Sequence, residues 1–172
     1  YLVTKVGEKK FIGKNIVYAG LWKKNDRHMV YNVIYLNKDD KKSYIKRFSI
    51  ESILKDKEYP ISKNIANSKI LYITGNPNSE SEIVKINLHF KSLAKKKEFE
   101  YDFNDILIKN RSSKGNILTK HPIRKIVQHQ LGKSTFGGKK IWFDEAIGKL
   151  NFDGRGELLG RFEADDNIIV IY

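Results

Sequence analysis

The chain has 172 residues, of which 40% are hydrophobic, 12% are aromatic and none is cysteine, and its formal net charge is +13. This length and apolar content suffice for one packed domain and argue against wholesale disorder. The lack of cysteine excludes disulfides and thiolate metal sites. No apolar run approaches the roughly 20 residues that a membrane span requires.

Alternating apolar and polar residues, separated by turn-forming loops, predict three β-hairpins along the chain. The intervening loops are rich in Gly, Asn, Asp, Ser and Pro, which supply turn geometry. The predicted pairs are 30–36 with 43–50 across 37–42, 70–74 with 83–90 across 75–81, and 158–162 with 167–172 across 163–166.

Two further segments have a clear period of two: apolar residues occupy the even positions of 84–90 and the odd positions of 99–103. Each pattern places apolar side chains on one face of a strand. Only residues 49–58 suggest a helix, of one or two turns. The sequence therefore predicts an all-β fold.

An all-β chain must protect the edges of its sheets, by closure, by sandwiching or by radial repetition. Strand-like units recur at intervals of roughly 40–70 residues, which favours a propeller-like radial array. We expect three or four small antiparallel blades. No linker divides the chain, so residues 1–172 are expected to form a single fragment of a larger domain, with a strand cut off at each end.

The positive charge is unevenly distributed. Residues 1–140 carry 30 basic and 13 acidic side chains, whereas residues 141–172 carry three and seven. Residues 106–143 contain nine Lys or Arg and no Asp or Glu. Such a surplus predicts a polyanionic partner. A general lysine bias would explain the many lysines, but it does not explain the missing acids.

No catalytic or metal-binding constellation is evident. Residues 132–135 resemble the end of a P-loop, but Val127 stands where the motif requires its first glycine. His121 and His129 are eight residues apart without nearby carboxylates, which is not a metal-ligand spacing. The carboxylate pairs 144–145 and 165–166 lie in turn-like contexts. We expect no cofactor and no catalytic residue.

Residues 109–125 are the most informative segment, because small polar residues alternate there with cations. Arg and Lys neutralise phosphates, while hydroxyl and backbone N–H groups add positioning contacts without reading sequence. No recognition helix and no aromatic RNA-binding signature accompany them. The pattern predicts binding to the nucleic-acid backbone, coupled to bending.

Several segments, taken in order, resemble the C-terminal DNA-binding domain of the A subunit of a bacterial type IIA topoisomerase (topoisomerase IV or DNA gyrase), of the Bacteroidetes type. They cover nearly the whole chain, and their order carries the resemblance. The segments are 11–16, 44–48, 55–59, 76–78, 111–116, 120–125, 132–135, 142–145, Arg155-Gly156 and Leu159-Gly160.

The resemblance implies a β-pinwheel, in which propeller-like blades exchange strands and duplex DNA wraps around a basic rim. It also implies a non-catalytic part of an ATP-dependent topoisomerase, in the cytoplasm at the bacterial nucleoid. The implied partners are double-stranded DNA, the B subunit of the enzyme and the remainder of its A subunit. We expect no membrane as a partner.

One departure from the gyrase pattern concerns its basic box, Gln-Arg-Arg-Gly-Gly-Lys-Gly. The matching residues 110–115 keep only Arg111, Lys114 and Gly115. Gyrase-like supercoiling is therefore not implied, and the choice between gyrase and topoisomerase IV stays open.

We expect sequence-independent binding and bending of duplex DNA, which guides DNA segments for strand passage. An alternative is a protein-interaction propeller, which would bind its partner with little dependence on salt; a propeller-type glycosidase would need convergent carboxylates that the sequence does not show. The residues predicted to contact phosphate are Lys46, Arg47, Arg111, Lys114, Lys120, Arg124, Lys125, Lys133, Lys139 and Lys140.

Overall fold

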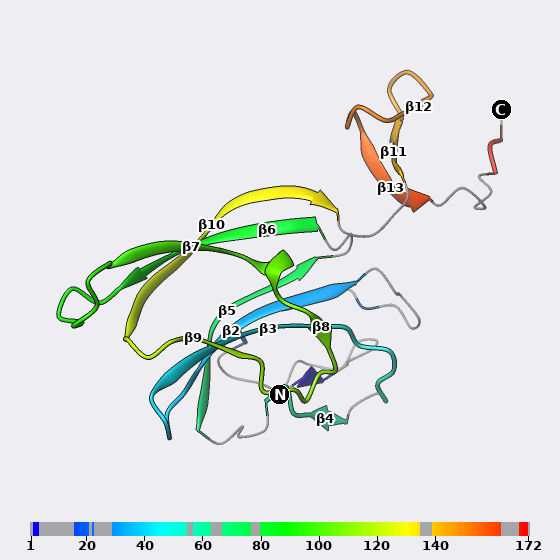
Figure 1. The fold of residues 1–172 in the computed structure, drawn as a ribbon. Coiled ribbons are helices and arrows are strands. Elements are labelled where there is room, and N and C mark those ends of the chain that lie inside the picture. Colours follow the sequence, from blue (N-terminus) through cyan, green and yellow to red (C-terminus); the bar gives the residue numbers. More distant parts are fainter. Residues whose placement is uncertain are drawn as a thin grey trace. The chain divides into compact units, whose positions relative to one another are not determined.

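Figure 1 shows the computed structural model, in which the described residues form β-strands and a single turn of 3-10 helix. This confirms the all-β class predicted from the sequence. The chain divides into two compact units, residues 1–135 and 136–172, which we describe separately. The described residues are 2–3, 16–20, 22, 29–54, 57–62, 67–76, 80–134, 139–162 and 169–171.

The first sheet of the larger unit has the strand order β5-β2-β3-β8, and β9 also pairs with β3. β2 and β3 are antiparallel, with Ile34 opposite Ile45, which confirms the first predicted hairpin. β8 pairs with β3 in the parallel direction. The strands are β2 (Val30–Asn37), β3 (Lys42–Phe48), β5 (Ser68–Asn76), β8 (Ile108–Lys109) and β9 (Asn116–Thr119).

The second sheet has the order β10-β6-β7 and is antiparallel throughout. It consists of β6 (Glu80–Leu88), β7 (Glu98–Asp102) and β10 (Ile123–Ser134). Val84, Ile86 and Leu88 of β6 are buried, as the alternation predicted. Phe90 does not continue the buried face, because β6 ends at Leu88 and the phenyl ring is 67% exposed.

The second predicted hairpin was wrong. β5 pairs with β2, whereas β6 pairs with β7 and β10, so the two strands lie in different sheets. Turn residues between two strands permit a reversal of the chain, but they do not determine whether the strands then pair by their edges or stack by their faces. Stacking is what buries the apolar face of β6.

An apolar core fills the space between these two sheets. Ile34 and Ile45 of the first sheet contact the same cluster as Val84 and Ile86 of the second. Phe103, in the 3-10 turn η1 (Phe103–Asp105), is fully buried in this cluster. The opposite face of the first sheet carries a second cluster around Tyr31, Tyr35, Tyr44 and Phe48. The first sheet is therefore covered on both faces, which explains the nearly continuous burial of β2 and β3.

The remaining strands form two small sheets. β1 (Leu2–Val3) pairs with β4 (Glu58–Tyr59) in the larger unit. In the smaller unit the order is β12-β11-β13, with β11 (Lys139–Asp144), β12 (Lys149–Asn151) and β13 (Glu157–Phe162). Residues 163–168 of the third predicted hairpin lie outside the described residues, and β13 pairs instead with β11.

Small, mainly antiparallel sheets without a closed barrel, as seen in the described residues, agree with a partial β-pinwheel. Of the segment 49–58, the described residues contain no helix. The described residues also include no helix long and apolar enough to cross a membrane. The grouping of residues 1–172 as one fragment stays a prediction.

Candidate nucleic-acid interface

The loop that connects β8 to β9, residues 110–115, contains the basic segment singled out in the sequence. It runs beside β3, because Ile45 of β3 pairs with Asn116 at the start of β9. Within it, the Ser113 amide donates to the Asn110 carbonyl at 3.1 Å, and the Ser112 hydroxyl lies 3.0 Å from the Asn110 side-chain oxygen. The loop is therefore a defined turn.

Lys46 of β3 anchors the backbone of this loop by hydrogen bonds. Its side chain is 1% exposed, and its ammonium group donates to the carbonyl oxygens of Arg111 at 2.7 Å and Ser113 at 2.9 Å, and also to that of Ile61. Burial, followed by the positive charge of Arg111, lowers the pKa of Lys46 to about 8. Lys46 thus positions backbone and offers no surface to a phosphate, so its predicted phosphate contact is not retained.

Arg47, the second predicted cation on β3, faces the core between the two sheets. It is 3% exposed, and its guanidinium lies 3.3 Å from the Asn104 side-chain oxygen. Burial lowers its pKa, whereas the nearby Asp102 and Glu82 carboxylates act in the opposite direction. Arg47 is a buried, charge-compensated residue, and we remove it as well from the phosphate-contacting set.

Glu82 of β6 is the acidic centre of this buried region, with 1% exposure. It accepts hydrogen bonds from Asn32 of β2 at 2.8 Å and from the hydroxyls of Thr74 and Tyr72 of β5. Burial and the bond to Glu82 raise the pKa of Tyr72. The carboxylate therefore links the second sheet to the first by hydrogen bonds as well as by charge.

Gly115 closes the loop against β3. Its φ is +86°, and a Cβ there would lie 2.5 Å from the Ile45 carbonyl oxygen and 2.8 Å from the Cβ of Lys46. Only glycine combines this backbone conformation with such a close approach. The Tyr35 hydroxyl also donates to the preceding carbonyl, of Lys114, at 2.6 Å.

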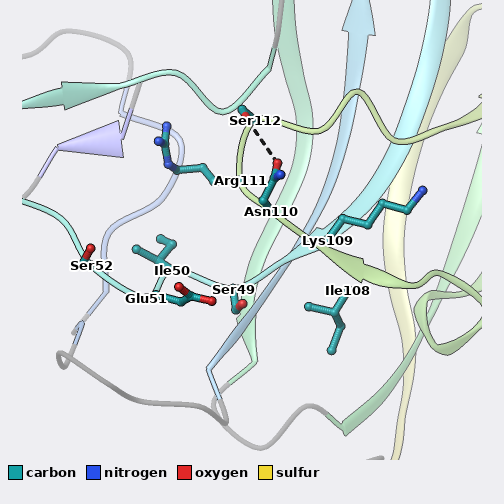
Figure 2. Close-up of a pocket in the computed structure, with 9 residues that line it drawn as sticks. All are labelled: Ser49, Ile50, Glu51, Ser52, Ile108, Lys109, Asn110, Arg111 and Ser112. Atoms are coloured by element: carbon teal, nitrogen blue, oxygen red, sulfur yellow. Dashed lines mark hydrogen bonds between the residues drawn. The ribbon is translucent and has the colours of Figure 1, made fainter.

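Arg111 is half-buried and packs toward β4. Its guanidinium carbon lies 4.8 Å from the centre of the Tyr59 ring, and it donates to the Pro60 carbonyl. Figure 2 shows this side chain extending from the loop along the edge of a pocket. The pocket has a volume of about 430 Å³ and is lined by residues 49–52 and 108–112.

The pocket itself carries mixed charge. Lys109 and Arg111 supply cations, but Glu51 supplies a carboxylate among the same lining residues (Figure 2). A carboxylate repels phosphate in a confined polar space. The interior of the pocket is therefore less favourable for a phosphate than the exposed cations around the loop.

Lys114 is an exposed residue of this loop, and a carboxylate of the same chain partly balances its positive charge. Its ammonium lies 3.8 Å from an Asp40 carboxylate oxygen and 4.8 Å from the centre of the Tyr44 ring. The Tyr44 hydroxyl and then the Asp40 carboxylate raise the pKa of Lys114, so the group stays charged at neutral pH. An exposed pair of this length contributes little to stability.

The start of β10 places two adjacent cations in solvent. The pairing with β6 shifts in register between Ile123 and Lys125, so Arg124 is the extra residue of a β-bulge. In a regular strand these neighbours would point to opposite faces, but the bulge leaves both Arg124 and Lys125 exposed. Lys120, at the end of β9, is exposed as well.

Lys109, Lys120, Arg124 and Lys125 have no ion-pair partner within the part of the chain that the structure describes. Of the other predicted cations, Lys139 is exposed and Lys140 is half-buried on β11 of the smaller unit, and the Lys133 side chain lies outside the described residues. Of the predicted set, Lys114, Lys120, Arg124 and Lys125 are therefore exposed, and Lys109, which was not predicted to contact phosphate, is exposed as well.

Two features were missed from the sequence. The anchoring role of Lys46 has only one signal, a lysine placed among the apolar residues of a strand. Four lysines between residues 91 and 97 were also overlooked, although that stretch contains no acid. In the described ranges, no group of three His, Asp or Glu side chains is arranged to hold a metal ion.

Comparison with known proteins gives two matches. A family model described as the topoisomerase C-terminal domain of Bacteroidota matches residues 1–130. The chain is also 27% identical over 127 residues to the A subunit of DNA topoisomerase 4 from Borreliella burgdorferi, an alignment that covers 73% of this chain and 18% of that protein. No solved structure matches.

Proposed function

The chain belongs to the topoisomerase C-terminal domain family of Bacteroidota, and on that premise we propose that it binds and bends duplex DNA without sequence preference. In this proposal it is a non-catalytic part of the A subunit of an ATP-dependent type II topoisomerase. It acts together with the B subunit and with the remainder of its own subunit, in the bacterial cytoplasm at the nucleoid, and guides DNA segments for strand passage.

The observation that carries the proposal is the set of exposed cations along the chain from Lys109 to Lys125. Lys109, Lys120, Arg124 and Lys125 lack ion-pair partners among the described residues, and the sequence from 106 to 143 contains no acid. An uncompensated set of this kind attracts phosphates by charge and releases counterions when it binds them. It provides no geometry for reading bases, so binding is expected to be indifferent to sequence.

The loop architecture supports the same function. The buried ammonium of Lys46 fixes the backbone of residues 111–113, so the adjacent cations are presented from a preorganised turn. Preorganisation lowers the entropy lost when the loop meets its partner. Because the alignment covers only 18% of the topoisomerase 4 relative, strand cleavage and ATP use, in this proposal, reside outside the matched region.

The test is fluorescence anisotropy of this chain with two unrelated duplexes of about 100 base pairs across a salt series. Five exposed cations, Lys109, Lys114, Lys120, Arg124 and Lys125, would give a slope of log affinity against log salt of about −4 to −5. Equal affinities for both duplexes with such a slope would support the proposal. Absent binding at low salt, or salt-independent binding, would refute it and favour a protein partner.

A further inference from the structure

The loop between β6 and β7, residues 89–97, combines charge with exposed apolar side chains. Leu93 is 95% exposed and Phe90 is 67% exposed. Four lysines, Lys91, Lys95, Lys96 and Lys97, surround them without an acidic residue between 89 and 97, and all four are exposed. Exposed apolar side chains set among cations in one short loop make this loop a candidate binding site.

This loop is held in a defined shape by its own polar groups. The Ser92 amide donates to the His89 carbonyl at 2.9 Å, and the Ala94 amide donates to the Ser92 hydroxyl at 3.0 Å. Lys97 donates to the Phe90 carbonyl at 3.0 Å and to that of Ser92. The exposure of Phe90 and Leu93 is therefore imposed by an ordered turn.

The aromatic side chain at the tip is itself oriented. The rings of His89 and Phe90 stack with their centres 4.5 Å apart, and the Lys91 ammonium lies 5.6 Å from the centre of the Phe90 ring. A flat apolar surface is thus bordered by a cation that can reach a phosphate. Leu93 provides a second, fully exposed apolar group four residues before Lys97.

The start of this loop lies next to the segment that carries Lys120 and Arg124. Leu88 pairs with Ile123, and the His89 amide donates to the Pro122 carbonyl at 2.8 Å. Lys120 and Arg124 therefore flank the base of the same hairpin. A duplex bound along Lys120 and Arg124 would therefore pass close to the start of this loop.

We propose that the β6–β7 loop is a DNA-bending wedge, in which Phe90 and Leu93 insert between base pairs from the minor groove while the surrounding lysines hold the flanking phosphates. Apolar side chains on basic segments use this mechanism to unstack a base step and kink the duplex by roughly 20–90°. The inference deepens the proposed function and rests on it.

Duplex DNA fits this loop better than a protein does. Two large apolar side chains within nine residues form a small patch, whereas a stable protein interface needs roughly 800 Å² from each partner. Lysine is depleted in protein interfaces, yet it supplies four of these nine residues. The charge and the size of the patch both favour a phosphate backbone with an insertable base step.

The experiment compares the wild-type chain with the double variant F90A/L93A, which keeps every lysine. Bending is followed by energy transfer between dyes at the ends of a duplex of about 30 base pairs, and unstacking by 2-aminopurine emission from its centre. The matched control is I147A/F152A, which removes one exposed aliphatic and one exposed aromatic side chain, 60% and 67% exposed, from the smaller unit.

We expect wild type and control to raise both signals on binding. F90A/L93A should bind with an unchanged salt slope and at most a threefold to tenfold lower affinity, but should leave both signals near those of free DNA. Full bending by F90A/L93A would overturn the wedge and leave the proposed function intact. Wild-type binding without bending would overturn the wedge and the bending part of the proposed function, and would leave DNA binding intact. Failure of wild type to bind at low salt would refute the proposed function itself.

Self-association is tested separately by sedimentation without DNA. A wild-type dimer that F90A/L93A abolishes and I147A/F152A retains would assign the tip to a second copy of the chain and overturn the wedge. A monomer under the same conditions, together with the bending result above, supports it.

Discussion

The ammonium nitrogen of Lys46 lies 2.7 Å from the carbonyl oxygen of Arg111, 65 residues further along the chain. A buried cation thereby fixes the backbone of the loop that carries the surface cations. The two positively charged residues have different tasks: Lys46 shapes the loop, and Arg111 packs on Tyr59 at its edge.

Replacing Lys46 with methionine should loosen this loop. Carbonyl groups of residues 61, 111 and 113 would lose their donor, and a buried acceptor left unsatisfied costs about 1–3 kcal/mol. We expect faster amide hydrogen exchange at Ser113 and a lower urea midpoint. The control K69M alters an exposed lysine of β5 and should change neither. Unchanged exchange at Ser113 in K46M would contradict the anchoring role.

The pH dependence of stability should carry a signature of Lys46. Its pKa is lowered from 10.5 to about 8 by burial, so between these values the unfolded chain binds this proton more strongly than the folded chain. Stability from this group therefore rises with pH across that window and is constant below it. The measurement is the difference in unfolding free energy between wild type and K46M. A difference that shrinks as pH rises from 8 to about 9.5 would show that the assigned environment is wrong.

Gly115→Ala should destabilise the fold more than Gly148→Ala. Both glycines have positive φ, +86° and +63°, which costs an alanine about 1–2 kcal/mol. At Gly115 the new Cβ would also meet the Ile45 carbonyl at 2.5 Å, whereas nothing lies within 4 Å at Gly148. Urea unfolding of the two variants separates the contact from the backbone strain. Equal decreases in the free energy of unfolding would mean that the close approach of Gly115 to β3 does not contribute to stability.

Glu82→Leu should be strongly destabilising, although leucine is close in size. The change would leave the donors of Asn32, Thr74 and Tyr72 without an acceptor and would remove one of the two carboxylates near the buried Arg47. Breaking a buried charged network costs about 3–5 kcal/mol. Glu98→Gln, which removes the charge from the exposed 2.6 Å pair with Lys85, is the control and should change stability little. Thermal melting of both variants provides the comparison.

Neutralising Lys120, Arg124 and Lys125 to glutamine should weaken DNA binding mainly at low salt. Each phosphate contact contributes about 0.9 to the slope of log affinity against log salt, so the triple variant should be shallower by about 2.7. Lys69→Gln removes an exposed charge from β5 and should leave the slope unchanged. A triple variant with the wild-type slope would place the phosphate contacts elsewhere on the chain.

The pattern of the sequence determined the all-β class, the hairpin of β2 and β3, and the alternation of β6. These features depend on side-chain periodicity and turn chemistry, which are local. The surplus of cations between Lys109 and Lys125 was also evident, because the absence of acids in 106–143 is a property of composition.

Tertiary structure alone decided which of the cations are available. Lys46 and Arg47 lie in a strand that is covered on both faces, so packing of the two sheets buries them, and the β-bulge at Arg124 turns two neighbouring cations outward. The packing of the two sheets also explains why β5 and β6 stack by their faces and do not pair by their edges. Burial and sheet partnership depend on contacts between residues far apart in the chain, and these cannot be deduced from local pattern.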